Sequence, residues 1–230
     1  MEAFDAGLIL LHGSGDQGEG LQAWLKQVSG KQWERTLKIK VVYPDAPLTP
    51  YTMAGGEDCR VWFDRQALSY SAPEDEDGVR RSVEQVDQEI DKMVQEGIPL
   101  RRIGVGGFSM GGCLAMHVVY GCGRYSGELG LCASMSTFLP ARSCLDDIAN
   151  AIFVEGQGGQ PPMKAPPIFM AHGTEDRMIN VAWAEDTRRR LEECNIPVPE
   201  VLPLYDGMAH ELSPDEVGKL AKFVGKHLMT

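Results

Sequence analysis

The heptapeptide GGFSMGG, residues 106–112, contains a single serine among four glycines. Its central residues, Gly107 to Gly111, match the pattern G-x-S-x-G, in which a serine occupies a sharp turn between a strand and a helix. The preceding residues RIGVG are typical of a buried strand, and the following residues MGGCLAMHVV are typical of a helix. The stretch therefore predicts a strand, a strained turn and a helix, with the hydroxyl of Ser109 exposed above a sheet.

Short apolar runs alternate with helical patterns on both sides of this stretch. Nearly continuous apolar runs are typical of strands that are covered on both faces of a sheet. The predicted strands are 7–12, 38–43, 102–107, 130–134 and 167–171. Apolar residues spaced by three and four predict helices over Val79–Val94 and Met110–Val118. This alternation predicts a doubly wound, mostly parallel α/β sheet that binds ligands at the carboxyl ends of its strands.

Three further segments complete the pattern. The sequence SPDE predicts the start of a last helix, because Ser213 and Glu216 can form a capping box. Residues 197–205, PVPEVLPLY, predict an extended edge segment, because proline cannot donate to a strand ladder. Segments 44–61 and 149–166 are rich in glycine and proline and do not fit the alternation, so we expect long loops there.

Composition limits the class of protein. A chain of 230 residues, 43% of them hydrophobic, fits one domain over 1–230. The formal net charge of -11 argues against nucleic acid and anionic membrane surfaces as partners. No apolar run is long enough for a signal peptide or a membrane span, so we expect no stable membrane insertion and a cytoplasmic location. The six cysteines lack CxxC spacing and are expected to be reduced thiols, without disulfides or zinc.

A serine hydroxyl becomes a nucleophile when a base takes its proton. After a G-x-S-x-G turn, the expected chain order is serine, then a carboxylate, then histidine. His210 lies in a loop just before the last helix, and we predict that it is the base. His172 ends a predicted strand and is a less favoured alternative for the base. His227 lies in the last turn of the predicted last helix, where a positive charge stabilises the helix end, so a role as the base is not needed to explain it.

Asp176 is the predicted carboxylate, because it follows the strand 167–171 and precedes His210. Glu175 and Asp186 are its alternatives. Glu175 is expected to point away from Asp176 in most turn geometries, and Asp186 lies among other charges on a predicted helix. Asp176 would fix the tautomer of the imidazole and stabilise the imidazolium.

The developing oxyanion needs hydrogen-bond donors. The residue after the nucleophile, Met110, is expected to provide one backbone N–H, and the loop after the first strand provides the second. That loop, LLHGSGDQGEG at 10–20, makes the N–H of Ser14 the leading candidate, with His12 and Asp16 as supports. The loop lacks the phosphate-binding pattern G-x-x-x-x-G-K-[ST], which disfavours nucleotide binding. We expect no cofactor and no metal.

Taken together, the segments resemble a known family, the acyl-protein thioesterase, carboxylesterase and lysophospholipase group of small serine α/β-hydrolases. The resemblance implies an α/β-hydrolase fold, the triad Ser109, Asp176 and His210, and oxyanion donors at Ser14 and Met110. The matching motifs are LLHGSGD (10–16), YPDAP (43–47), WFD (62–64), GGFSMGG (106–112), HGTED (172–176) and MAHEL (208–212).

Ser14, Met110 and the sequence WFDR are more similar to the lysophospholipase-like protein branch than to the thioesterases proper. That resemblance implies a shallow acyl pocket and a short-chain carboxylesterase, acting on a small-molecule acyl ester or an acylated protein. The alternatives are an acyl-protein thioesterase (depalmitoylase) or a lysophospholipase for long acyl chains, and, less favoured, a non-catalytic ligand-binding protein or a peptidase. Trp62 and Phe63 either line the substrate site or belong to the core.

Overall fold

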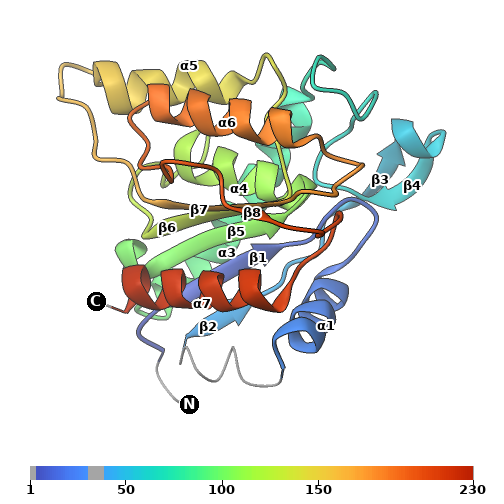
Figure 1. The fold of residues 1–230 in the computed structure, drawn as a ribbon. Coiled ribbons are helices and arrows are strands. Elements are labelled where there is room, and N and C mark those ends of the chain that lie inside the picture. Colours follow the sequence, from blue (N-terminus) through green and yellow to red (C-terminus); the bar gives the residue numbers. More distant parts are fainter. Residues whose placement is uncertain (1–3, 31–38, 230) are drawn as a thin grey trace.

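A six-stranded parallel sheet in the order β2-β1-β5-β6-β7-β8 forms the centre of the molecule (Figure 1). The computed structural model describes residues 4–30 and 39–229. All five predicted strands are present, although Lys38 lies outside the described residues. The strands are β1 (Gly7–Leu11), β2 (Lys40–Val42), β5 (Ile103–Phe108), β6 (Leu131–Met135), β7 (Ile168–Gly173) and β8 (Leu204–Tyr205).

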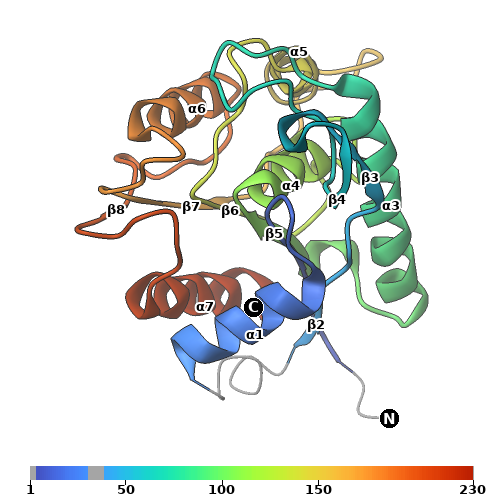
Figure 2. The ribbon, with the colours of Figure 1, turned by 90° about the vertical axis from the view of Figure 1, so that its right-hand side faces the viewer.

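Helices cover both faces of this sheet (Figures 1 and 2). One face carries α1 (Gly18–Ser29) and α7 (Pro214–Leu228). The other carries α3 (Glu76–Gln95), α4 (Met110–Tyr120), α5 (Cys144–Asn150) and α6 (Val181–Glu193). Each face has its own cluster of buried apolar side chains. The predicted doubly wound α/β class is therefore confirmed, and we infer that the described residues form one domain around this sheet.

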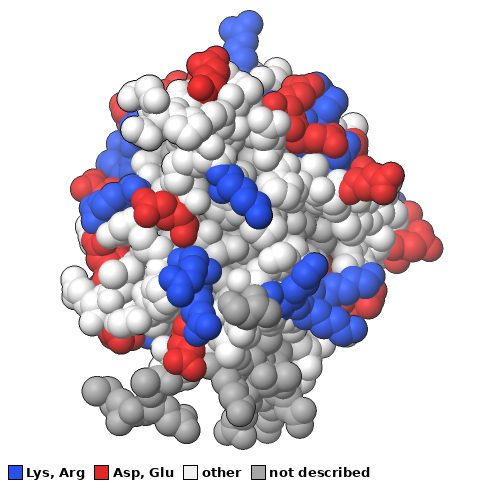
Figure 3. Space-filling view, turned by 90° about the vertical axis from the view of Figure 1, so that its left-hand side faces the viewer, with Lys and Arg blue, Asp and Glu red and all other residues white. Residues whose placement is uncertain are grey.

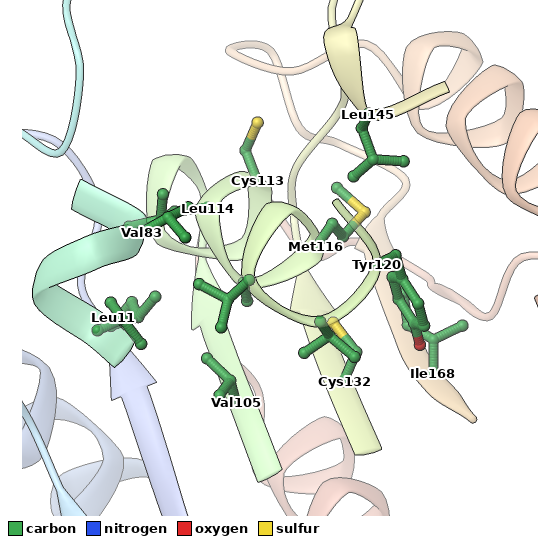
Figure 4. Close-up of a cluster of buried hydrophobic side chains, with 14 of the residues drawn as sticks. Leu11, Val83, Val105, Cys113, Leu114, Met116, Tyr120, Cys132, Leu145 and Ile168 are labelled. Atoms are coloured by element: carbon green, nitrogen blue, oxygen red, sulfur yellow. The ribbon is translucent and has the colours of Figure 1, made fainter. Parts of the chain in front are cut away.

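The helix α4 is buried on every side. The sequence predicted a single apolar stripe from Met110 to Val118, but all residues of α4 are buried. Figure 4 shows the reason, since Val105 and Cys132 of the sheet lie below α4 while Val83 of α3 and Leu145 of α5 flank it. The element that follows Ser109 is consequently held by contacts in all directions.

Segment 44–61 is not the irregular loop that the sequence predicted. It forms an antiparallel hairpin of β3 (Leu48–Tyr51) and β4 (Glu57–Arg60), joined by a short 3-10 helix over Thr52–Ala54. The hairpin was missed because most of its side chains are exposed or only half buried and do not alternate between apolar and polar. Segment 149–166 starts with the end of α5 and a π-helical turn over Ala151–Glu155, and its remaining residues are irregular, as expected.

Two other helices were not predicted. The helix α1 begins at Gly18, inside a glycine-rich stretch that hid it, because glycine has a low helix propensity. The helix α5 has only 7 residues, too few for a clear periodic signal. At the carboxyl-terminal end the predictions hold: β8 is a two-residue edge strand, and α7 begins with the predicted capping box of Ser213 and Glu216.

Two further properties bear on the expected partners. Among the described residues, no helix combines the length and the apolar character that crossing a bilayer requires. On the face shown in Figure 3, basic and acidic side chains are interspersed among uncharged ones. Neither sign of charge forms a continuous area over that face.

Glu216 has a buried carboxyl that makes stability depend on pH. It is 0% exposed, and its Oε1 has no hydrogen-bond partner among the described residues. Burial raises the pKa of Glu216 from 4.5 to about 7, although the hydrogen bond from the Ser213 N–H opposes this shift. The native state therefore holds this proton more tightly than the unfolded chain, and stability falls as the pH rises from 4.5 to 7.

Replacing this carboxyl by an amide tests the assignment. Glutamine also completes a capping box, so Glu216→Gln should match the wild type at pH 5 and be more stable at pH 8.5 by about 2 kcal/mol. Urea unfolding at both pH values measures this difference. Asp215→Asn, at an exposed position beside it, is the control and should show no such gain. Equal stability of Glu216→Gln and wild type at pH 8.5 would contradict the assignment.

Candidate active site

Ser109 lies at a strained turn between β5 and α4. Its φ of 55° and ψ of -119° are unfavourable for any residue with a side chain. The turn is possible because its flanks are glycines: a Cβ on Gly107 would lie 2.3 Å from the carbonyl carbon of Gly111, and a Cβ on Gly111 would lie 2.2 Å from the Leu11 oxygen. The G-x-S-x-G pattern is thus a steric requirement of this close crossing.

Backbone contacts fix Ser109 from two directions. Its N–H donates to the Met135 oxygen of β6 at 2.9 Å. Its carbonyl accepts the N–H groups of Gly112 and Cys113 in the first turn of α4. A Cβ on Gly13 would lie 3.4 Å from the Ser109 Cβ, so the loop after β1 lies directly against the serine. The predicted neighbourhood of Ser109 and the glycine-rich loop is therefore present.

Asp176 and His210 form a hydrogen-bonded pair. The Nδ1 of His210 lies 2.7 Å from the Oδ2 of Asp176. The other carboxylate oxygen accepts the N–H groups of Met178 at 2.9 Å and Ile179 at 2.8 Å. Burial alone would raise the pKa of Asp176, but hydrogen bonds from His172, His210 and Ile179 outweigh it and hold the pKa well below its usual range. Asp176 is therefore an anion fixed in one orientation toward His210.

His172, the alternative base, lies beneath this carboxylate. It is 0% exposed, its Nε2 lies 2.9 Å from the Ile179 oxygen, and the same nitrogen is 3.3 Å from the Asp176 Oδ2. The geometry supports a bracing role for His172, whereas His210 is partly exposed at the rim. Two histidines in contact with one carboxylate were not predicted from the sequence. The spacing of four residues between His172 and Asp176 in HGTED was the available signal.

The loop that carries His210 is docked onto the end of β7. A Cβ on Gly173 would lie 2.1 Å from the Met208 oxygen, so this approach requires glycine. Glu175 uses its backbone N–H to bind the same oxygen at 2.9 Å, and its side chain is exposed. Of the alternative carboxylates, Asp186 pairs with Arg189 and Arg190 on α6. The carboxylate in contact with His210 is Asp176.

Aromatic packing connects the two halves of the site. The ring of Phe108, the last residue of β5, lies 4.7 Å from the His210 ring. Trp24 of α1 packs edge-on against Phe108, with the two ring centroids 5.0 Å apart. The imidazole is therefore held beside the residue that precedes Ser109.

The loop after β1 is supported by His12. Its Nε2 accepts the N–H of Ala46 at 2.9 Å, its Nδ1 lies 2.7 Å from the Gly13 oxygen, and its carbonyl accepts the Trp62 Nε1–H at 2.9 Å. Burial lowers the pKa of His12, so a neutral ring with its proton on Nδ1 satisfies these bonds. This matches the predicted role of His12 as a support of the loop after β1.

Trp62 and Phe63 belong to the core. They are 2% and 4% exposed, so the structure favours the core alternative over direct contact with substrate. Trp62 still affects the site, because its ring lies 5.1 Å from His12 and its N–H binds the His12 carbonyl.

One cluster has the residue types of a metal site. Ligand atoms of Glu74, Cys113 and His117 lie within 4.8 Å of one another. The carboxylate of Glu74, however, already binds the His117 Nε2 at 3.0 Å, the Ser143 hydroxyl and the Cys144 N–H at the start of α5. Burial would raise the pKa of Glu74, but these partners lower it to about 2. The cluster is therefore a buried hydrogen-bond network that caps α5.

Comparison with known proteins identifies the family. The family model described as Phospholipase/Carboxylesterase matches residues 2–228. Lysophospholipase-like protein 1 of Mus musculus is 34% identical over 220 residues, which cover 95% of this chain and 85% of the mouse protein. Acyl-protein thioesterase 1 homolog 1 of Dictyostelium discoideum is 30% identical over 224 residues, which cover 97% of this chain and 91% of that protein.

Solved structures share the fold. The crystal structure of Arabidopsis thaliana SOBER1 superimposes with a TM-score of 0.80 and 25% identity, covering 97% of this chain and 99% of that one. Zea mays acyl-protein thioesterase 2 has a TM-score of 0.72 at 24% identity, covering 99% and 95% of the two chains. The chain therefore belongs to the phospholipase/carboxylesterase family of α/β-hydrolases and is a serine ester hydrolase.

Proposed function

We propose that Ser109 is the nucleophile, His210 the general base and Asp176 the carboxylate that orients it. The observation that carries this proposal is the 2.7 Å hydrogen bond between the Asp176 Oδ2 and the His210 Nδ1, beside the strained turn of Ser109. An imidazole that donates through Nδ1 keeps Nε2 free to accept a proton.

Acylation begins when the His210 Nε2 takes the proton of the Ser109 hydroxyl. The serine oxygen attacks the acyl carbonyl, and negative charge develops on the carbonyl oxygen. The backbone N–H groups of Met110 and Ser14 stabilise that charge. Collapse of the tetrahedral intermediate releases the alcohol or thiol, which takes its proton from the imidazolium, and leaves an acyl group on Ser109.

Deacylation repeats the same chemistry with water. The neutral His210 takes a proton from water, and the hydroxide attacks the acyl-enzyme. Ser109 leaves with the proton from the imidazolium, and the carboxylic acid is released. The charge of Asp176 stabilises the imidazolium in both halves without accepting its proton.

The proposed substrates are short-chain carboxylic esters of small molecules. The choice is supported by the resemblance of Ser14, Met110 and WFDR to the lysophospholipase-like protein branch, which implies a shallow acyl pocket, and the chain is 34% identical to a protein of that name. Three cavities of about 620, 600 and 470 Å³ are present, but Ser109, Asp176 and His210 line none of them, so none of the three is an acyl pocket at the proposed triad. The alternative is hydrolysis of long acyl esters or thioesters on proteins or lipids, and it is supported by the thioesterase relatives.

We also propose that the enzyme works in the cytoplasm. All six cysteines are free thiols, which is the state expected in a reducing compartment. The proposed chemistry uses protein groups and water alone.

Removing the nucleophile provides the first test. Ser109→Ala should abolish turnover of p-nitrophenyl butyrate and labelling by a fluorophosphonate, because alanine has no hydroxyl to acylate. Ser71→Ala, a substitution at an exposed serine, is the control and should keep both. A Ser109→Ala protein that still turns over the ester would reject the assignment, and an unlabelled but folded wild type would favour a non-catalytic binding protein.

Removing the charge of Asp176 provides the second test. Asp176→Asn should lower kcat by about 10³- to 10⁴-fold, because the amide no longer fixes the productive tautomer of His210. In the wild type, Asp176 should add no limb to the pH profile of kcat/KM, since its pKa lies well below the usual range. Glu175→Gln is the neighbouring control. Loss of activity in Glu175→Gln instead would reassign the carboxylate.

A chain-length series provides the third test. Rates for p-nitrophenyl acetate, butyrate, octanoate and palmitate should fall beyond the short acyl chains, because a shallow pocket leaves extra methylenes in water. The comparison uses kcat/KM below the critical micelle concentration of each ester. A steady rise toward the long chains would support the thioesterase or lysophospholipase alternative.

A further inference from the structure

His172 is a buried histidine beside the proposed triad that takes no part in the proposed proton transfers. Its side chain is 0% exposed. It lies on β7, between β6 and β8 (Figure 1), where its register partner is Leu204 and its N–H donates to the Pro203 oxygen at 3.1 Å. The sheet therefore fixes the backbone of His172 independently of the loop that carries Asp176.

The proton of a neutral His172 ring must lie on Nε2. This nitrogen is 2.9 Å from the Ile179 oxygen and 3.3 Å from the Asp176 Oδ2. A carbonyl and an ionised carboxylate are both acceptors, so an unprotonated Nε2 would direct its lone pair at two other lone pairs. The Nε2–H of His172 therefore donates to the Ile179 oxygen and has the Asp176 oxygen as a second, longer acceptor.

Ile179 connects His172 to the carboxylate by a second route. The N–H of Ile179 donates to the Asp176 Oδ1 at 2.8 Å, while its carbonyl lies 2.9 Å from the His172 Nε2. The N–H of Met178 donates to the same Oδ1 at 2.9 Å. One N–H of His172 thus contacts Oδ2 directly and also holds the backbone that supplies the donors of Oδ1.

The rotation of the Asp176 carboxylate decides how His210 is held. The His210 Nδ1 lies 2.7 Å from Oδ2, and His210 belongs to a loop. The last side-chain torsion of an aspartate is soft, so its rotation is fixed only when bonds hold both oxygens. A turned carboxylate would withdraw Oδ2 from His210 and release the tautomer that keeps Nε2 ready to accept a proton.

We propose that His172 is a positioning residue of the hydrolysis, which fixes the Asp176 carboxylate so that His210 keeps its productive tautomer and orientation. His172 acts through Asp176 and Ile179 alone. A catalytic group supported from a rigid strand gains in kcat, whereas substrate binding does not depend on that support. This inference rests on the proposed function, because it requires that His210 activates Ser109.

Three substitutions separate the Nε2–H donor from the rest of the ring: His172→Gln, His172→Asn and His172→Leu. The amide nitrogen of glutamine lies as many bonds from Cα as the Nε2 of histidine, that of asparagine lies one bond closer, and leucine has no donor. Thr187→Val is the structural control. It removes a buried hydroxyl of α6 that accepts the Leu139 N–H and donates to the Trp183 oxygen.

The test uses p-nitrophenyl butyrate and a fluorophosphonate. His172→Leu and His172→Asn should lower kcat by about 10- to 100-fold and change KM by less than about 2-fold, because only the alignment of the base is lost. The rate of labelling should fall by the same factor, since labelling needs the same base. His172→Gln should recover most of kcat. Thr187→Val should lower the melting temperature and keep the kcat of the wild type.

A double substitution tests whether His172 acts through Asp176. Asp176→Asn already loses the productive tautomer, so adding His172→Leu should lower kcat further by less than about 3-fold. The ring proton gives a separate readout on the wild type. Nitrogen-15 NMR of histidine-labelled protein should show a proton on the Nε2 of His172, and a ring protonated on Nδ1 alone would overturn the inference.

Four kinetic results would overturn the inference while the esterase function stands: a folded His172→Leu protein with the kcat of the wild type, an effect confined to KM, a His172→Gln protein as slow as His172→Leu, or a full further loss in the double variant. If His172→Leu does not fold, His172→Asn and the NMR spectrum decide. A folded wild type that neither hydrolyses the ester nor reacts with the fluorophosphonate would instead reject the proposed function. Melting temperatures establish that each comparison is made on folded protein.

Discussion

The close crossing of β5 and α4 is the steric constraint on which the site depends. At Gly107 the two backbones approach so closely that a Cβ has no room beside Gly111, and Gly111 itself has no room for a Cβ because it packs against the Leu11 oxygen at the end of β1. The turn between them leaves Ser109 in a backbone conformation that the chain would not adopt alone. Packing around all sides of α4 prevents the turn from relaxing. The free energy that folds the core therefore also maintains the strain that exposes the hydroxyl.

Asp176 plays a comparable part on the other side of the site. A buried carboxylate is stable here because backbone N–H groups, His172 and His210 all bind it. The bond to His210, together with the bond from the Glu175 N–H to the Met208 oxygen, joins the segment after β7 to the loop before α7, with Gly173 permitting the approach. The hydrogen bond between Asp176 and His210 therefore both holds the loop before α7 and orients the His210 imidazole.

Glu74 and Arg65 are two buried charged groups outside the proposed triad, and their surroundings differ. Glu74 is surrounded by donors, and its pKa falls to about 2 because the charged form is so well bound. Arg65 has two aromatic rings and no acceptor for its Nη2 among the described residues. The first group has its partners within the protein. The second is stabilised by the faces of two rings, and its Nη2 has no acceptor within residues 4–30 and 39–229.

The sequence by itself determined the parallel strands, the capped last helix and the order of Ser109, Asp176 and His210, because periodicity, capping and turn chemistry are local. Only the tertiary structure decided that residues 44–61 form a hairpin, that His172 shares a carboxylate with His210, that Trp62 lies in the core, and that the Nη2 of Arg65 is buried without a partner among the described residues. The hairpin was hidden because its side chains are mostly exposed or half buried and do not alternate, whereas the other features depend on contacts between segments far apart in the chain. Local patterns do not specify such contacts, because strand register and helix packing set them.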